Sequence, residues 1–414
     1  MKKIIVVFVN NSMAELDWLM PILDRLSKDY KIFTYFRNKK SYDSLRQNIA
    51  LYKAWKKINT FIFVERSFNN LLFKFLKKTS FFFGFRELGY YLNNIINDIR
   101  IIKNIIEKEI TLDKYKIKII FSDLQENFLF LENFKKIKNR PLIVHYPHSP
   151  MAYVKRKNYT RKVRLCGDVL LVGRKNDIPF FEKSIHKKKI ISVGTPKFDS
   201  WWIKKTFLSY KNKLDFGYTL KDIKKKFIIT IAYDSKFAEK RFKKKINLMN
   251  NQLKDLMDIV SKISNVLIIF KIHPRRNSNK FKYILNQYNK NIWVVSKMHL
   301  SQLVNFSDCF ISVPSSAAGY EALTFKVPLI ALPEISGVDS TSTSNSTLNL
   351  IEIAKDKNDL SRLINLSKNK RNKLWQAQQK KFNFNYPNKD NASIEALKII
   401  KKEQKKLSDI SYIL

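Results

Sequence analysis

The chain has few of the features on which disulfide-linked, zinc-binding and membrane-spanning proteins depend. Its two cysteines, Cys166 and Cys309, lie far apart and match no metal-ligand or redox spacing. No apolar run approaches the roughly 20 residues that a transmembrane helix requires. We therefore expect neither a zinc site nor a membrane span, and the cysteine usage fits a reducing compartment.

Glycine and acidic residues are also scarce. The 414 residues include 8 glycines, and 35 acidic side chains stand against 79 basic ones, for a formal net charge of +44. A charge of this size suits binding to nucleic acid or to an anionic membrane. The abundance of lysine, asparagine, isoleucine and phenylalanine is equally typical of an AT-rich genome, and the lysines are scattered. Both explanations stay open, although no recognised nucleic-acid-binding motif accompanies the charge.

The first residues, MKKIIVVFVNN, have the basic start and apolar core of a signal peptide. Asn10, Asn11, Glu15 and Asp17 then occupy the place where small residues would form a cleavage site. We interpret this segment as the first strand of a cytoplasmic protein.

Strand-like and helix-like segments alternate along the whole chain, which is typical of parallel sheets covered by helices. A chain of 414 residues also exceeds the size at which one hydrophobic core keeps growing. We predict an α/β protein with two Rossmann-like, doubly wound domains that face a cleft. The expected strands are 3–9, 31–36, 117–122, 142–146, 169–173, 189–194, 227–233, 266–272, 291–296, 309–313 and 327–332.

The domain boundaries are predicted where this alternation weakens. Residues 201–226 have no clean period and are expected to connect the domains. We expect an N-terminal domain at 1–205, a C-terminal domain at 206–385 and a helical tail at 386–414. Ligands of doubly wound sheets bind at the carboxyl ends of the strands. Polar residues that directly follow a strand are therefore the first candidates for a functional site.

The strand at 266–272 ends in such a group, because His273, Pro274, Arg275 and Arg276 follow it directly. The proline stiffens the loop and fixes the direction of the histidine. The two guanidinium groups are planar donors suited to a carboxylate or a phosphate. We expect these residues at the edge of the cleft, while a histidine at a strand end also occurs as a purely structural side chain.

A second candidate lies at 309–334, where a buried strand leads through Pro314, Ser315 and Ser316 into a helix. The backbone N–H groups at the helix start, the helix dipole and the two hydroxyls together suit an anion such as phosphate. The alternative is that one serine only caps the helix. We expect this stretch and the one at 273–276 to end adjacent strands and to face the same cleft.

The order of these motifs resembles bacterial surface-polysaccharide transferases of the GT-B fold: sialyltransferases, capsule-type Kdo transferases and CDP-glycerol glycerophosphotransferases. The resemblance rests on His273 and Pro274, on the later pair Ser315 and Ser316, and on GTPKFD at 194–199. The last element is similar to the one that ends the N-terminal domain in this broader group. In these families the His-Pro and Ser-Ser elements hold the nucleotide and its phosphate, which implies the same roles here.

The resemblance also implies an acceptor-binding N-terminal domain and a nucleotide-donor C-terminal domain. Glu321, with Ala322 after it, resembles the Glu-Ala of many GT-B donor sites, where the carboxylate meets the ribose. An exposed helical glutamate is the alternative. Arg275 and Arg276 would suit an acidic donor or acceptor.

The acidic element that supplies the base in sialyltransferases, Asp/Glu-Asp/Glu-Gly, is absent from the N-terminal half. Inverting transfer nevertheless needs a group that takes the proton of the acceptor hydroxyl. Glu15 also fits a capping box, which is its alternative role. His148 resembles the strand-end histidine of the glycerophosphate-transfer relatives. The candidate bases are Glu15 and Asp17 after the first strand, Asp123 and Glu126 in FSDLQENF, and His148 in HYPHSP.

The resemblance implies an inverting glycosyltransferase of surface-glycan assembly, such as capsule or lipopolysaccharide, that uses a nucleotide-activated sugar, with a CMP-linked acidic sugar as the expected donor. The sequence has no clear Asp-x-Asp pair of the kind that metal-dependent glycosyltransferases use. We therefore expect a helix N-terminus, His273 and an arginine to stabilise the negative charge of the leaving group without a metal or cofactor. The expected partners are the donor and a glycan or lipid-linked acceptor, without specific nucleic acid.

Three other functions are weighed against this one. CDP-linked polyol phosphate transfer uses a similar scaffold. A nucleotide-sugar 2-epimerase shares the fold, but its Gly-Thr-Arg-Pro-Glu start is absent from VNNSMAE at 9–15. A basic nucleic-acid-binding protein is supported by the charge alone.

The segment at 69–92 mixes aromatic residues with Lys74, Lys77, Lys78 and Arg86. It is too charged to cross a bilayer but suited to lying on one. Such a surface would hold the enzyme at the inner face of the cytoplasmic membrane, beside a lipid-linked acceptor. The alternative is a helix pair of the N-terminal core whose lysines snorkel.

Overall fold

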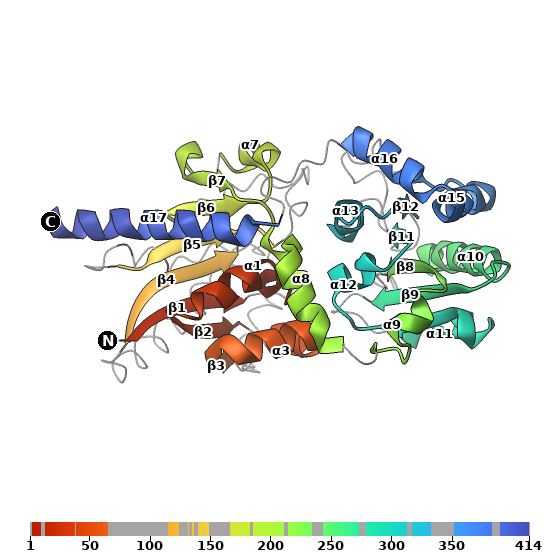
Figure 1. Ribbon diagram of the computed structural model, residues 1–414, viewed down its shortest axis with the longest axis horizontal. Coiled ribbons are helices and arrows are strands. Elements are labelled where there is room, and N and C mark those ends of the chain that lie inside the picture. Colours follow the sequence, from red (N-terminus) through yellow and green to blue (C-terminus); the bar gives the residue numbers. More distant parts are fainter. Residues whose placement is uncertain are drawn as a thin grey trace, which may run out of the picture.

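The computed structural model describes residues 2–9, 13–37, 39–64, 115–123, 131, 135, 140–148, 166–182, 185–210, 214–233, 243–272, 279–312, 317–332, 352–382 and 390–413. These residues form two α/β domains that lie end to end (Figure 1). The predicted membrane-surface segment at 69–92 lies outside them. Within the described ranges, no helix is long and apolar enough to span a bilayer.

The described strands of the first domain form a seven-stranded parallel sheet in the order β3-β2-β1-β4-β5-β6-β7. The winding reverses between β1 and β4, which are neighbours at the centre of the sheet. The strands are β1 (Lys2–Val9), β2 (Lys31–Phe36), β3 (Asn59–Val64), β4 (Tyr115–Asp123), β5 (Leu142–Tyr146), β6 (Val169–Val172) and β7 (Ile190–Ser192). The helices before the second domain are α1 (Met13–Leu26), α2 (Lys39–Arg46), α3 (Ile49–Ile58), α7 (Ile178–Phe181) and α8 (Ser200–Phe207).

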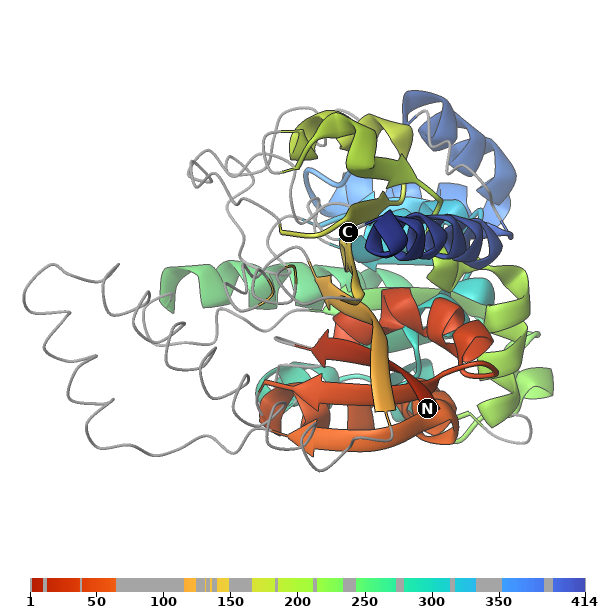
Figure 2. The ribbon, with the colours of Figure 1, turned by 90° about the vertical axis from the view of Figure 1, so that its left-hand side faces the viewer.

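Side chains of β1 alternate between the two faces of this sheet. Ile5 and Val7 enter the core beneath α1 and α3, whereas Ile4 and Phe8 enter a smaller core on the opposite face. The last helix of the chain, α17 (Ala392–Ile413), covers the same face as α1, and its Ile400 is fully buried there (Figure 2). The residues expected to form a C-terminal tail therefore end in a helix that belongs to the first domain.

The second domain contains a six-stranded parallel sheet in the order β10-β9-β8-β11-β12-β13, and its winding reverses between β8 and β11. Its strands are β8 (Phe227–Tyr233), β9 (Val266–Ile272), β10 (Trp293–Ser296), β11 (Cys309–Ser312), β12 (Leu329–Ala331) and β13 (Glu352–Ile353). The helices are α9 (Leu220–Ile223), α10 (Lys243–Val260), α11 (Asn279–Leu285), α12 (Leu300–Asn305), α13 (Ala317–Thr324), α15 (Lys357–Asn369) and α16 (Arg371–Phe382).

Helices cover both faces of the second sheet. Ile268 and Phe270 of β9 pack against α10, α11 and α15, while Leu267 and Ile269 face the core beneath α9 and α12. Such continuous apolar strands are typical of parallel sheets that are buried on both sides. The doubly wound architecture predicted for each half of the chain is therefore present.

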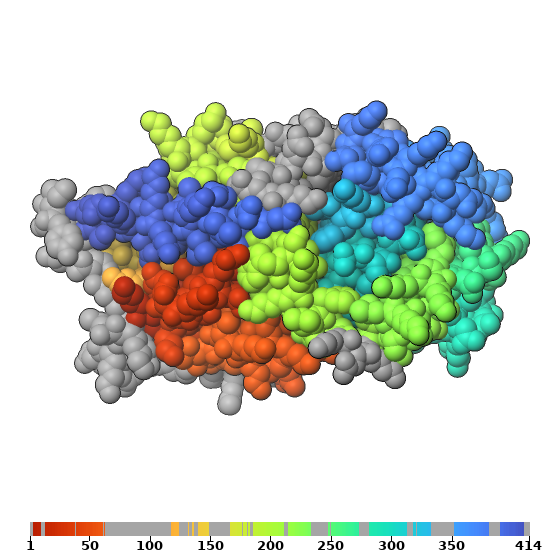
Figure 3. Space-filling model, in the orientation of Figure 1, coloured from red at the N-terminus to blue at the C-terminus, as the bar shows by residue number. Residues whose placement is uncertain are grey.

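The connection between the domains is packed rather than loose. The chain passes from α8 through a short 3-10 turn at Leu208–Tyr210 into the second domain, which Figure 3 shows as the green band joining the two lobes. Tyr210 and Leu214 are buried in one cluster with Ala50 of α3 and Ile228 of β8. Apolar contacts from both domains thus fix the junction, although the sequence there has no regular period.

Candidate functional site

An aspartate and a histidine meet at the carboxyl edge of the first sheet. Asp123 is the last residue of β4, and His148 stands two residues beyond the end of β5. β4 and β5 are paired in register, with Asp123 opposite Tyr146. Nδ1 of His148 contacts Oδ2 of Asp123, whose residue is only 1% exposed. The structure thus brings together two of the residues predicted as candidate bases.

Asp123 sets the tautomer and the orientation of this imidazole. An ionised carboxylate only accepts hydrogen bonds, so Nδ1 of His148 carries the proton and the ring lone pair lies on Nε2. The buried negative charge also stabilises the imidazolium that forms when Nε2 takes up a proton. An oriented imidazole of this kind is chemically suited to general base catalysis. The pair stands beside the point where the winding of the sheet reverses, which is the usual ligand position in doubly wound sheets.

The other histidine of the HYPH stretch, His145, belongs to the core instead. It is 1% exposed, and its Nδ1 lies 3.2 Å from the backbone oxygen of Ser122, to which it can donate. A Cβ added to Gly167 would lie 2.2 Å from Cδ2 of His145, so only glycine leaves room for this ring. Burial, partly opposed by the Ser122 hydrogen bond and nearby carboxylates, lowers the pKa of His145 to about 4.

This buried histidine should make the protein sensitive to acid. Because the pKa of His145 is about 4 when folded and 6.5 ordinarily, the unfolded chain takes up the proton first as the pH falls. The His145 contribution to stability is complete above pH 6.5 and is lost toward pH 4, by about 3 kcal/mol. Urea unfolding of the wild type and of His145→Gln at several pH values measures how this contribution to the free energy of unfolding depends on pH. The variant His186→Gln, which replaces an exposed histidine, is the control. Equal pH slopes for all three proteins would contradict the prediction.

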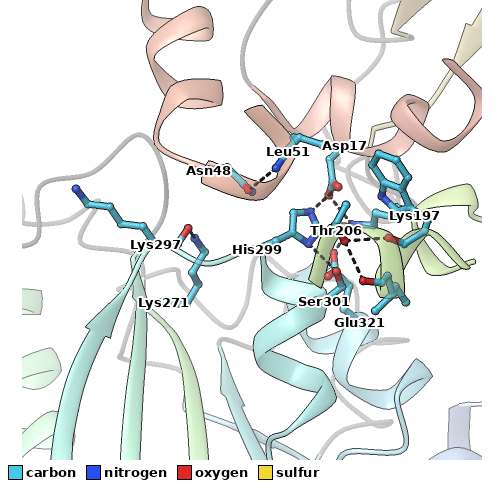
Figure 4. Close-up of polar contacts among 12 residues, drawn as sticks. Asp17, Asn48, Leu51, Lys197, Thr206, Lys271, Lys297, His299, Ser301 and Glu321 are labelled. Carbon is cyan, nitrogen blue, oxygen red and sulfur yellow. Dashed lines mark hydrogen bonds and ion pairs between the residues drawn. The ribbon is translucent and has the colours of Figure 1, made fainter. Parts of the chain in front are cut away.

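A cluster of charged side chains joins the two domains (Figure 4). Nε2 of His299, the residue before α12, lies 2.5 Å from Oδ1 of Asp17 in α1. Lys197, in a 3-10 turn at Pro196–Phe198, lies with its Nζ 3.5 Å from Oδ2 of Asp17 and also contacts Oε1 of Glu321 in α13. All four residues are at most 7% exposed. Asp17 of α1 and Lys197 of the turn before α8 therefore connect the first domain to the start of α12 and to the middle of α13 in the second.

The charges in this cluster support one another. Burial raises the pKa of Asp17, but His299 and Lys197 together outweigh it and lower this pKa to about 2. Burial lowers the pKa of Lys197, whereas Glu321 and Asp17 together raise it above its ordinary value. Both groups are thus charged at neutral pH. A carboxylate with a pKa of about 2 is a weak proton acceptor, so in this arrangement Asp17 is better suited to holding the domains together than to general base catalysis.

Of the three predicted glutamates, Glu126 lies outside the described residues, and Glu15 and Glu321 have different surroundings. Glu15 is completely buried in α1, where its charge adds to the effect of burial in raising the pKa of Tyr146. Glu321 is 5% exposed, so the alternative of an exposed helical glutamate does not apply. Its Oε1 contacts Lys197, while its buried Oε2 has no hydrogen-bond partner among the described residues. A buried carboxylate oxygen without a hydrogen-bond partner is suited to accept a hydrogen bond from a hydroxyl of a ligand.

The remaining predicted donor residues lie outside the described residues: His273, Pro274, Arg275, Arg276, Ser315 and Ser316. The strands that lead to them are described, and they correct one expectation. β9 and β11 are not adjacent, because each pairs with β8, which lies between them. The physical reason is the winding of the domain, since its first strand occupies the centre and later strands are added on both sides.

The sequence did not single out Lys197, His299 or Lys271 as site residues. Lys197 stands inside GTPKFD, and His299 stands directly before a helix, which are the only local signals for them. Lys271 interrupts the apolar run of β9 one residue before its end. Among the described residues, no group of His, Cys, Asp and Glu side chains could hold a metal ion.

Comparison with known proteins supports the fold. No family model matches the sequence, and a search of curated proteins finds no match. A Listeria monocytogenes protein described as a UDP-N-acetylglucosamine 2-epimerase is similar in structure, with 12% identity over 97% of each chain and a TM-score of 0.61.

A glycosyltransferase and a polymerase are similar in structure as well. The calicheamicin glycosyltransferase CalG4 has 8% identity over 99% of this chain and 100% of its own, with a TM-score of 0.56. The wall teichoic acid polymerase TagF has 13% identity over 97% of this chain and 88% of its own, with a TM-score of 0.54. At these identities the likeness concerns the fold. The chain therefore has the GT-B fold, with two Rossmann-like domains, as the sequence predicts.

Proposed function

We propose that the protein is an inverting glycosyltransferase of surface-glycan assembly, which moves a sugar from a nucleotide donor to a hydroxyl of a glycan or lipid-linked acceptor. The observation that carries this proposal is the Asp123–His148 pair, an oriented base at the strand ends of the first domain. The GT-B fold is consistent with it, and the fold neighbours include a glycosyltransferase.

In this proposal His148 is the catalytic base. Its Nε2 takes the proton of the acceptor hydroxyl as the acceptor oxygen bonds to the anomeric carbon of the sugar. The bond from that carbon to the nucleotide phosphate breaks on the opposite side, so the configuration inverts. Asp123 stabilises the imidazolium that results.

The second domain would hold the donor. His273 and Pro274 with Ser315 and Ser316 are proposed to bind the nucleotide and its phosphate, and the buried Oε2 of Glu321 is proposed to accept a ribose hydroxyl. Arg275 and Arg276 favour an acidic sugar, and a CMP-linked one follows from the resemblance to sialyltransferases and Kdo transferases. Positive side chains and backbone N–H groups would meet the leaving-group charge without a metal.

CDP-polyol phosphate transfer is the second candidate, and the same pair favours it. An oriented histidine can activate a hydroxyl for attack on phosphorus as well as on carbon. The structure of the wall teichoic acid polymerase TagF was obtained with CDPG, and TagF shares the fold. The two functions differ in their products, because phosphate transfer leaves a phosphodiester on the acceptor that phosphorus NMR detects.

A thermal-shift screen against CMP, CDP, UDP and GDP tests the proposal, since a ligand that binds only the folded state raises Tm. We expect one nucleotide, with CMP or CDP favoured, to raise Tm by several degrees at millimolar concentration. Its nucleoside and random-sequence DNA at physiological salt are the controls. No shift with any nucleotide would contradict a transferase, and conversion of UDP-N-acetylglucosamine to its epimer without an acceptor would identify an epimerase instead.

A further inference from the structure

A lysine occupies a buried position at the end of an apolar strand. Lys271 is the last residue but one of β9, and it is 9% exposed. The alternation of the strand places it on the same face as Leu267 and Ile269, which pack into the core beneath α9 and α12. The position therefore continues an apolar face, where a charged side chain would not be selected for packing.

The ammonium group of Lys271 has no carboxylate partner among the described residues. Its Nζ donates to the backbone oxygen of Lys297 at 3.2 Å, which satisfies one of its N–H groups (Figure 4). The nearby Asp215 accepts hydrogen bonds from Ser296 Oγ at 2.7 Å and from the backbone N–H of Lys297 at 2.5 Å. A buried charge without an opposite charge is costly to the folded state. A bound anion would supply the opposite charge that this position lacks.

The position of Lys271 indicates which anion. β9 is next to β8, and the winding of the second sheet reverses on the other side of β8. Lys271 therefore stands at the carboxyl edge, beside the place where doubly wound domains bind nucleotides. The carboxylates of Asp17, in the first domain, and of Glu321, in α13 of the second, are engaged by Lys197, so they are not dedicated to Lys271.

We propose that Lys271 binds the phosphate of the nucleotide donor and neutralises the charge of the leaving nucleotide. This inference rests on the proposed function and deepens it, because it assigns the leaving-group contact to a described side chain. Lys271 is a binding residue in this role: it takes no proton, and the N–H groups that do not donate to the backbone oxygen of Lys297 donate to the phosphate oxygens.

The protonation of Lys271 suits this task. Burial lowers its pKa to about 8, partly opposed by the carboxylates of Asp215, Asp17 and Glu321 and assisted by the charge of Lys297. The group is therefore mainly an ammonium at pH 7, and a bound phosphate would favour that form further.

The test is calorimetry of the full chain with the nucleotide that gives the largest thermal shift, and with its nucleoside. Lys271→Met keeps the length and apolar stem of the side chain but removes the charge. We expect a loss of nucleotide affinity of about tenfold or more, with nucleoside affinity unchanged. Lys290→Met is the matched control, because Lys290 is exposed before the neighbouring strand β10, at the opposite edge of the sheet.

Stability without ligand separates binding from structure. Because methionine removes a buried, unpaired charge, Lys271→Met should unfold at the same or a higher temperature than the wild type. A variant that is more stable but binds nucleotide weakly has lost a binding group rather than a structural one. A marked fall in Tm would assign Lys271 a structural role and overturn the proposal.

The pH dependence gives a second measurement. Wild-type affinity should decline as the pH rises from about 7.5 to about 9.5, because only the ammonium form binds phosphate, whereas Lys271→Arg should show a flatter profile. Equal nucleotide affinity of the wild type and Lys271→Met would overturn the inference while leaving the proposed function in place. An effect confined to the intact nucleotide sugar would assign Lys271 to the sugar and also overturn it. A wild type that binds no nucleotide would remove the proposed function, and the inference with it.

Discussion

Replacing His148 by alanine is expected to lower kcat by about 10²-fold to 10⁴-fold, the range by which a positioned acid or base accelerates a reaction. The reason is that the acceptor hydroxyl would lose the group that takes its proton. Donor affinity should change little, because His148 belongs to the first domain and the donor is proposed to bind the second. Single-turnover transfer with the donor identified by the ligand screen measures the first effect, and calorimetry measures the second.

The variant Asp123→Asn provides a second test of the role of His148 as the base. An amide can donate to Nδ1 and thereby favour the wrong tautomer, so kcat should fall by about 10²-fold or more although the imidazole is retained. His186→Ala is the matched control, because His186 is an exposed histidine of the same domain. Wild-type turnover in His148→Ala would show that the base lies elsewhere. Loss of stability in Asp123→Asn comparable to a core mutation would assign the pair a structural role.

Lys197→Met is expected to lower the free energy of unfolding by about 3–5 kcal/mol, as removal of one partner from a buried ion pair generally does. The variant leaves the carboxylate of Glu321 buried without its cation and removes one of the two groups that stabilise the charge of Asp17. Because the cluster joins the domains, the loss should also loosen their connection. Urea unfolding measures the stability, and proteolysis near the junction reports the connection.

The double variant Lys197→Met, Glu321→Gln tests why the loss of Lys197 is expected to destabilise the protein. If the cost comes from an unpaired buried carboxylate, neutralising Glu321 should recover a substantial part of the lost stability. Lys205→Met is the control, because its ion pair with Asp24 is at the surface, where the lysine side chain is 43% exposed. That change should cost less than about 1 kcal/mol. Equal effects of Lys197→Met and Lys205→Met would show that the cluster does not fasten the domains.

The elements were predictable wherever the sequence marks their ends. The strand expected at 266–272 agrees with β9, because glycine-free apolar runs bounded by polar residues indicate buried strands. β3 was missed because it begins directly at Asn59, the residue that caps α3, so no turn separates helix and strand in the sequence. The two-residue strand β13 is too short to have a pattern of its own.

The Asp123–His148 pair of the candidate site could also be predicted from the sequence. Asp123 was identified because it follows a strand, and His148 because it resembles the strand-end histidine of the glycerophosphate-transfer relatives. The two strands turned out to be neighbours. The resemblance pointed to His148, but the sequence offered no physical reason to prefer it to His145, which also stands within HYPH. Burial beside Gly167 made one of them a core residue, and the contact with Asp123 gave the other its orientation.

The sequence by itself determined the two doubly wound domains, because the alternation of apolar strands and amphipathic helices is a local property that each segment carries with it. Only the tertiary structure decided that Asp17, Lys197, His299 and Glu321 form one cluster, and that Lys271 is left without a carboxylate partner among the described residues. The distances between these side chains depend on the order of the strands around β1 and β8 and on the packing of the two domains against each other. Charges far apart in the chain interact strongly only after folding has removed the water between them.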